Sequence, residues 1–195
     1  MKISRHFSTK DWVRLKFDSE ADWAQAILIL KDRLEARYLE HIRILLHRRN
    51  SGFAVLTLDC ALIETLEQFR RGKQATPSRK GKEYFISFLT TTDFSKHFSA
   101  KIASAFYTQI RCGLLHQTET DGHSKIKHGD SLPLISEIMN GTGLIINKQL
   151  FHLLLEKVIS RYLMDLENPE NVTLRQSFRS KMDSICRADR RTSSM

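Results

Sequence analysis

Apolar residues recur at steps of three or four along much of the chain, and this spacing is typical of amphipathic helices. The first long stripe lies between Asp18 and Arg49, with Asp18 or Ser19 as a candidate helix cap and residues 50–52 as a break. Its apolar members are Trp23, Ile27, Leu30, Leu34, Tyr38, Ile42 and Leu45. The pattern therefore predicts one long helix with a single buried face.

The segment 53–69 is apolar almost all round, so we expect it at the centre of the fold. Residues 74–82 are basic and contain Pro77 and Gly81, which predicts a loop, and a shorter apolar piece covers residues 84–89. Another helical stripe follows and has Gly113 near its end. Its apolar members are Phe94, Phe98, Ile102, Ala105, Phe106, Ile110 and Leu114.

The chain is polar from residue 117 to residue 140, and only residues 131–135 could form a short extended piece there. Asn147 can cap a last strong helix, which the break at residues 167–169 ends. Residues 172–187 predict a weaker, basic amphipathic helix before a polar tail.

Four strong helices without convincing alternating strands predict an all-α fold. We expect an up-and-down bundle of four main helices with shorter peripheral helices. The bundle is expected over residues 18–168, between an N-terminal segment (1–17) and a basic C-terminal helix with its polar tail (169–195).

The composition narrows the function classes. The chain has 195 residues, which is one domain's worth. Its three cysteines form no CxxC pair, so neither a disulfide framework nor a zinc site is expected. No apolar run approaches the roughly 20 residues of a membrane helix, and no apolar signal core is present. We expect a cytoplasmic protein with no membrane contact, no metal and no cofactor.

The net positive charge of the chain favours a polyanionic partner. Lys and Arg number 31 against 22 Asp and Glu, which gives a net charge of +9. The cations gather near residues 37–49, 70–82 and 175–191, with His41 and His47 in the first group. Each group can be a solvated face, or it can bind phosphates and make binding depend on salt. Both interpretations remain open from the charges alone.

Several known sites are missing from the sequence, including a phosphate-binding Gly-rich loop, a GxSxG elbow and HExxH. Glu64 and Glu67 stand one helical turn apart and could offer two carboxylates to a metal, but no Glu-x-x-His partner exists. We expect surface carboxylates that offset Arg70 and Arg71.

Arg111 and His116 lie five residues apart at the end of a predicted helix. On an ideal helix their side chains would be about 140° apart and about 7.5 Å apart along the axis. Gly113 permits the chain to unwind, which would let His116 fold back toward the guanidinium. Such a pair suits phosphodiester cleavage by the ribose 2′-hydroxyl, because His moves protons near neutrality and Arg stabilises the charge that grows on the phosphate.

The stretch Arg111-Cys-Gly-Leu-Leu-His116 resembles the signature of the HEPN superfamily, in which Arg is followed after four to six residues by His at the end of a helix. Residues 59–64, 145–151 (expected to open the final helix) and 161–166 are also similar to prokaryotic members. The resemblance extends over roughly residues 20–167.

The resemblance implies a helical bundle that pairs as a homodimer and places two Arg/His motifs across one cleft. It implies a metal-independent endoribonuclease of bacterial defence, toxin or stress-response type, with an antitoxin or a nucleotidyltransferase as a possible further partner. Arg111 would stabilise the phosphate and His116 would transfer protons, while Glu64 would orient one of them. Cys112 departs from the polar residue that many catalytic members carry at this position.

Three hypotheses follow. The first is cleavage of RNA by Arg111 and His116. The second, which Cys112 motivates, is a non-catalytic HEPN module that binds RNA, a nucleotide or a protein partner. The third is a helical scaffold without a nucleic-acid role.

Overall fold

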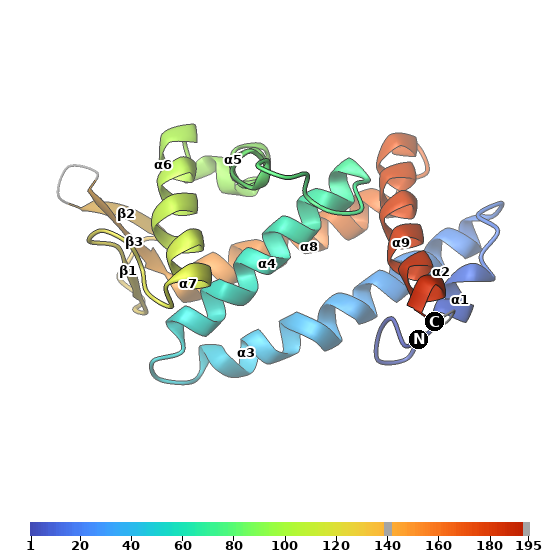
Figure 1. Cartoon of the computed structure of the whole chain (residues 1–195), viewed down its shortest axis with the longest axis horizontal. Helices are drawn as coiled ribbons and strands as arrows, with labels where there is room; N and C mark the ends of the chain where they lie inside the picture. Colours follow the sequence, from blue (N-terminus) through green and yellow to red (C-terminus); the bar gives the residue numbers. More distant parts are fainter. Residues whose placement is uncertain (139–141, 193–195) are drawn as a thin grey trace. The chain divides into compact units, whose positions relative to one another are not determined.

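The computed structural model describes residues 1–138 and 142–192 (Figure 1). The fold is mostly helical, as the sequence predicts. The chain divides into two compact units. Unit 1 comprises Met1–His41, Gln68–Ala75 and Ser160–Met195, and unit 2 comprises Ile42–Glu67 and Thr76–Ile159.

The predicted long helices are present, with ends close to the expected residues. The first runs as α2 (Glu20–Leu34), a π-helical segment η1 (Glu35–Leu39) and α3 (Glu40–Leu46). Ser19 caps its start, because the Ser19 hydroxyl accepts a hydrogen bond from the Asp22 N–H. The other long helices are α4 (Gly52–Arg71), α8 (Lys148–Glu167) and α9 (Val172–Thr192), and α1 (Thr9–Val13) is short.

Unit 1 contains residues 1–17 together with α9, and aromatic side chains form much of its core. Phe178 of α9 is fully buried and packs against Phe69 and Trp12. The Trp12 Nε1–H donates a hydrogen bond to Asp183, also on α9. Burial of Phe178 shows that α9, for all its cations, has an apolar face within the core.

Unit 2 holds the first part of α4, the first part of α8, and a run of shorter helices between them. These are α5 (Gly81–Thr91), the 3₁₀ turn η2 (Asp93–Lys96), α6 (Ala100–Ala105), the π-helical segment η3 (Phe106–Cys112) and α7 (Gly113–His116). Phenylalanines fill the core between them: Phe106 stacks on Phe151 of α8 with ring centroids 5.2 Å apart.

A three-stranded sheet in unit 2 corrects the all-α expectation. It consists of β1 (Lys125–Lys127), β2 (Ile135–Ile138) and β3 (Gly143–Asn147), in the order β1-β3-β2. The central strand β3 pairs parallel with β1 and antiparallel with β2, and the sheet lies beside the helix through α6 and α7 (Figure 1). Residues 145–147 were therefore wrongly expected to open the final helix, although Asn147 does cap it. The up-and-down arrangement of four main helices stays a prediction.

The start of α8 follows from the Asn147 side chain. Its Oδ1 accepts hydrogen bonds from the backbone N–H groups of Gln149 and Leu150, at 3.2 and 3.4 Å. No helix in the described part of the chain is long and apolar enough to cross a bilayer.

Asp32 in unit 1 is held ionised. Burial raises its pKa, but hydrogen bonds from the Ser4 hydroxyl and from the backbone N–H and ring of His6 outweigh this effect and lower the pKa to about 2. The unfolded value is 3.8, so the stabilisation is present above about pH 4 and is lost as the pH falls through 2.

We therefore expect Asp32→Asn to lower the free energy of unfolding by up to about 2 kcal/mol at pH 5. At pH 2 the variant and the parent should be almost equally stable. Urea unfolding at the two pH values measures this difference. An equal difference at both would show that Asp32 stabilises through packing alone.

Candidate functional site

Arg111 lies in the π-helical segment η3, and His116 ends the following helix α7. The expectation that Gly113 unwinds the helix is wrong, because Gly113 has helical angles (φ −58°, ψ −52°). A π-helical segment adds one residue to a turn, and such segments are frequent at functional sites. The helix thus stays continuous through the motif.

Gly113 is required for a different reason. A Cβ at this position would overlap the carbonyl oxygen of Glu119 and would approach the backbone N of Asp121 to 3.1 Å. After His116 the chain reverses at Thr118, which has a positive φ of 57°, and the N–H of Asp121 then donates to the Gln109 carbonyl at 2.7 Å. The loop therefore packs directly on the helix that carries the motif.

Glu64 of α4 and Arg111 are brought together. Arg111 Nη2 donates to Glu64 Oε2 at 3.0 Å, and the two side chains are 16% and 25% exposed. Burial opposes the charge on Arg111, but the hydrogen bond to Glu64 and the nearby Tyr107 and Glu64 charges raise the pKa of Arg111. The guanidinium is therefore a fixed positive charge at a partly buried position.

Two aromatic rings complete the surroundings of Arg111. Its guanidinium carbon lies 5.4 Å from the ring centroid of Tyr107 and 5.9 Å from that of Phe85, which are cation–π distances. The Nε atom of Arg111 is buried and has no hydrogen-bond partner among the described residues. Unsatisfied buried donors are uncommon in native proteins, and each needs an explanation, of which a catalytic role is one.

His116 is exposed, in contrast to Arg111. Within residues 1–138 and 142–186, whose side chains are described, no hydrogen bond or ion pair joins the two residues. The structure thus brings Glu64 to Arg111 and leaves His116 at the surface, five residues further along the same helix.

Neighbouring groups have other roles than the sequence suggested. Glu67 was expected at the surface but is buried, where it accepts a hydrogen bond from the Ser87 hydroxyl at 2.7 Å. Cys60 is also buried, and burial raises the pKa of its thiol. Cys112 is half-buried beside Tyr107 and is one of the groups that raise the pKa of Tyr107, after burial.

Sequence reasoning missed the aromatic neighbours of Arg111 and a buried polar pair. Tyr107 precedes Arg111 by four residues on the same helix, which is the spacing of helical neighbours and was a usable signal. Asp59 and His152 are both fully buried, and His152 Nδ1 lies 2.8 Å from Asp59 Oδ1. Asp59 interrupts an otherwise apolar face of α4, and that interruption was the available signal.

Comparison of the chain with protein-family models, with curated proteins and with solved structures gives no match. A function therefore has to be inferred from the residues of this chain.

Gly113→Ala should destabilise unit 2 by about 1–3 kcal/mol, because the new methyl group would overlap loop backbone that has little freedom to move. Urea unfolding followed by circular dichroism measures the change. Gly129→Ala is the matched control, since a Cβ there would meet only the Leu132 side chain at an ordinary 3.5 Å. Equal effects of the two substitutions would contradict the close packing assigned to Gly113.

Proposed function

We propose that the protein is a metal-independent endoribonuclease of the HEPN type, active in bacterial defence or stress response. Arg111 stabilises the charge on the scissile phosphate, and His116 transfers protons. The observation that carries the proposal is the position of Arg111, which Glu64 and two aromatic rings hold on the helix that ends with the exposed His116.

The chemistry requires only the groups of the motif. The ribose 2′-oxygen attacks phosphorus and loses its proton to an imidazole, while the bond from phosphorus to the 5′-oxygen breaks and that oxygen receives a proton. The products are a 2′,3′-cyclic phosphate and a free 5′-hydroxyl. Arg111 stays charged throughout, and its unused N–H donors suit the additional negative charge on the phosphoryl oxygens.

A homodimer suits this arrangement. Accepting a proton from the 2′-hydroxyl requires a neutral imidazole, and donating a proton to the 5′-oxygen requires an imidazolium. One imidazole cannot be in both protonation states when the step begins. Two copies of His116 across one cleft would supply an acceptor and a donor together, and the exposure of His116 leaves it accessible to a second chain.

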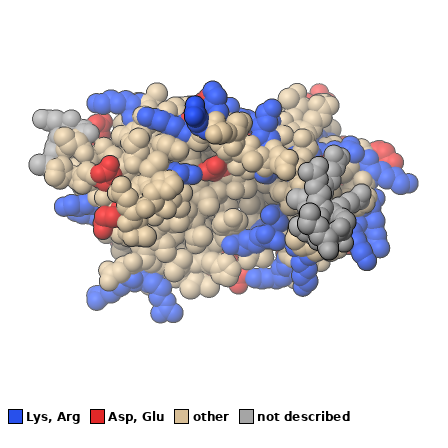
Figure 2. Space-filling view, in the orientation of Figure 1, with Lys and Arg blue, Asp and Glu red and all other residues tan. Residues whose placement is uncertain are grey.

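The surface charge supports an RNA substrate. On the face shown in Figure 2, Lys and Arg side chains are spread over the surface and Asp and Glu side chains are fewer. Positive potential of this kind attracts phosphate backbones and makes binding weaker as salt increases.

His116→Ala should abolish cleavage of structured and single-stranded RNA in excess EDTA, because the proton-transfer group is removed. Analysis of product ends should find 2′,3′-cyclic phosphates with the parent protein only. His97→Ala is the matched control, since His97 is also exposed but lies outside the motif, and it should cleave like the parent. Equal cleavage by His116→Ala and the parent would refute the proposal. Salt-dependent RNA binding without product from any of the proteins would favour a non-catalytic binding module.

Glu64→Gln should lower the cleavage rate by roughly tenfold or more, because the neutral amide holds the Arg111 guanidinium less firmly in its productive position. Single-turnover kinetics measures the rate apart from binding. In an Arg111→Ala background, Glu64→Gln should have little further effect, since its influence passes through Arg111. Additive losses would contradict this positioning role.

A further inference from the structure

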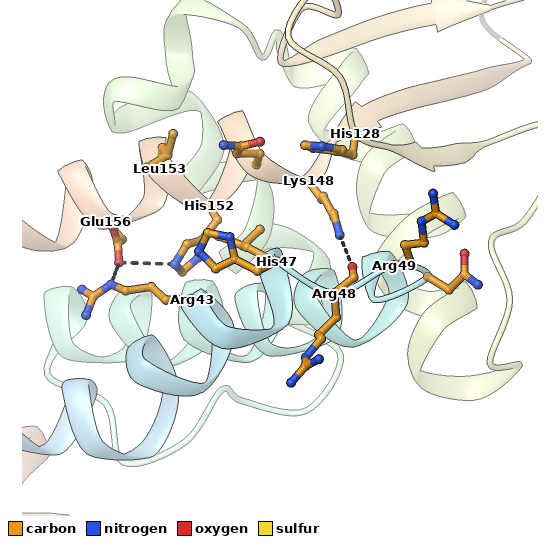
Figure 3. Close-up of a pocket in the computed structure, with 12 residues that line it drawn as sticks. Arg43, His47, Arg48, Arg49, His128, Lys148, His152, Leu153 and Glu156 are labelled. Atoms are coloured by element: carbon orange, nitrogen blue, oxygen red, sulfur yellow. Dashed lines mark hydrogen bonds and ion pairs between the residues drawn. The ribbon is translucent and has the colours of Figure 1, made fainter.

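A groove of about 990 Å³ lies in unit 2, between the turn that joins α3 to α4, the loop after β1, and one face of α8 (Figure 3). None of its lining residues belongs to the Arg111–His116 motif. Its charged members are mostly cationic, with Glu156 as the one acidic side chain in the lining. The cations are Arg43, Arg48, Arg49 and Lys148, and three histidines join them: His47, His128 and His152.

Two of these cations have no side-chain partner among the described residues. Arg43 pairs with Glu156, from Nε to Oε1 at 2.7 Å. The side chains of Arg48 and Arg49, in contrast, form no hydrogen bond or ion pair with any described residue, and both are exposed. An arginine without a carboxylate partner keeps its forked set of N–H donors available for a planar or tetrahedral anion.

The turn that carries these arginines is fixed in place. Lys148 is buried, and its Nζ donates to Ser51 Oγ at 2.7 Å. The same Nζ donates to the Arg48 carbonyl at 3.3 Å (Figure 3). Ser51 Oγ in turn donates to the Arg48 carbonyl at 2.9 Å. Burial lowers the pKa of Lys148, because the ammonium group loses water when it contacts Ser51 and the Arg48 carbonyl. Asn50 has a positive φ of 57°, a conformation that Asn adopts more readily than most residues.

Asn147, the residue before Lys148, fixes the loop that carries His128. Asn147 Nδ2 donates to the carbonyl oxygens of Gly129 and Leu132, each at 3.0 Å. Asn147 and Lys148 thus hold two separate loops at the start of α8, and both loops line the groove. A binding surface that is already ordered loses less entropy when a ligand binds.

The floor of the groove carries a buried imidazole. Lys148, His152 and Glu156 follow one another at steps of four on α8 and so share one face. His152 is fully buried, with Nδ1 at Asp59. Its Nε2 has no hydrogen bond to a described residue and lies 3.3 Å from Glu156 Oε1, an ion-pair contact. His152 therefore connects the groove to the core, because its ring contacts Glu156 in the lining and Asp59 in the core.

We propose that this groove is a phosphate-binding site, in which Arg48 and Arg49, together with His47 and His128, bind phosphate groups carried by RNA or by a free nucleotide. Apolar side chains also line it, among them Leu46 and the half-exposed Leu153, and these suit a sugar or a base next to the phosphate. The site does not require the chain to cleave RNA.

The test uses the His116→Ala protein, so that RNA stays intact if the chain is an endoribonuclease. One probe is a fluorescent single-stranded RNA of about 12 nucleotides, within the usual range of site sizes for one binding module. The other is ATP, measured by calorimetry. The groove variant is Arg48→Ala/Arg49→Ala, and the control Arg14→Ala/Lys96→Ala removes the same charge from exposed residues outside the groove. Thermal melting checks that both variants are folded.

The groove variant should raise Kd about tenfold or more for at least one probe, while the control changes it less than about twofold. For RNA, the slope of log K against log salt should become shallower by about 1.4, because each neutralised phosphate of a single strand contributes about 0.7. Loss of RNA binding alone would assign the groove to RNA phosphates, and loss of ATP binding would assign it to nucleotides.

Equal weakening by the groove variant and the control would overturn the proposal, since general charge would then explain the binding. The proposal would also be overturned if the His116→Ala protein, with its native groove residues, bound neither probe at low salt. Cleavage by the protein with native His116 is a separate measurement. The endoribonuclease and the phosphate groove can therefore fail independently.

Discussion

The buried hydrogen bond between Asp59 and His152 is the contact on which the structure of unit 2 depends most. It joins α4 to α8 in the core, and neither side chain has any exposed surface. Removing two polar groups from water costs free energy unless they are hydrogen-bonded, so the bond between them favours the packing in which these two helices meet. Glu64, which holds Arg111, lies five residues after Asp59, and Lys148, which holds the Arg48 turn, lies four residues before His152.

The two arginine groups built on this frame differ in a way that matches different tasks. Arg111 is mostly buried, paired with Glu64 and placed against two rings, so its position is set before any ligand arrives. Such a preorganised charge suits stabilisation of a transition state. Arg48 and Arg49 are exposed and pair with none of the residues that the structure describes, which suits attraction and binding of an anion.

Local signals made the helices predictable, whereas long-range pairing did not. Ser19 and Asn147 cap helices as their side chains suggest, and the break at residues 167–169 ends α8 where it was expected. The sheet was missed because its strands have three to five residues, and an apolar run as short as residues 144–146 fits a strand or the start of a helix equally well. Its parallel pair also joins segments about twenty residues apart, which no local pattern records.

The candidate site was predictable to a similar extent. Glu64 contacts Arg111, and its orienting role stays a prediction, whereas Gly113 does not unwind the helix as its conformational freedom suggested. The space beside Gly113 is taken by the backbone of residues 119–121, and the fold of that loop cannot be derived from the spacing of Arg111 and His116. The pairing of Asp59 with His152 could not be derived from the sequence either. The two residues are 93 positions apart and come into contact only when α4 packs against α8.

The adjacency of Asn147 and Lys148 has a consequence for local unfolding. These two consecutive residues hold the loop at Gly129–Leu132 and the turn at Arg48–Ser51, and they form the junction at which β3 ends and α8 begins. Opening of this junction would release both loops in one event. Amide protons on either side of the groove would then exchange with solvent through a shared opening, and the groove would behave as one cooperative unit that forms or disperses as a whole.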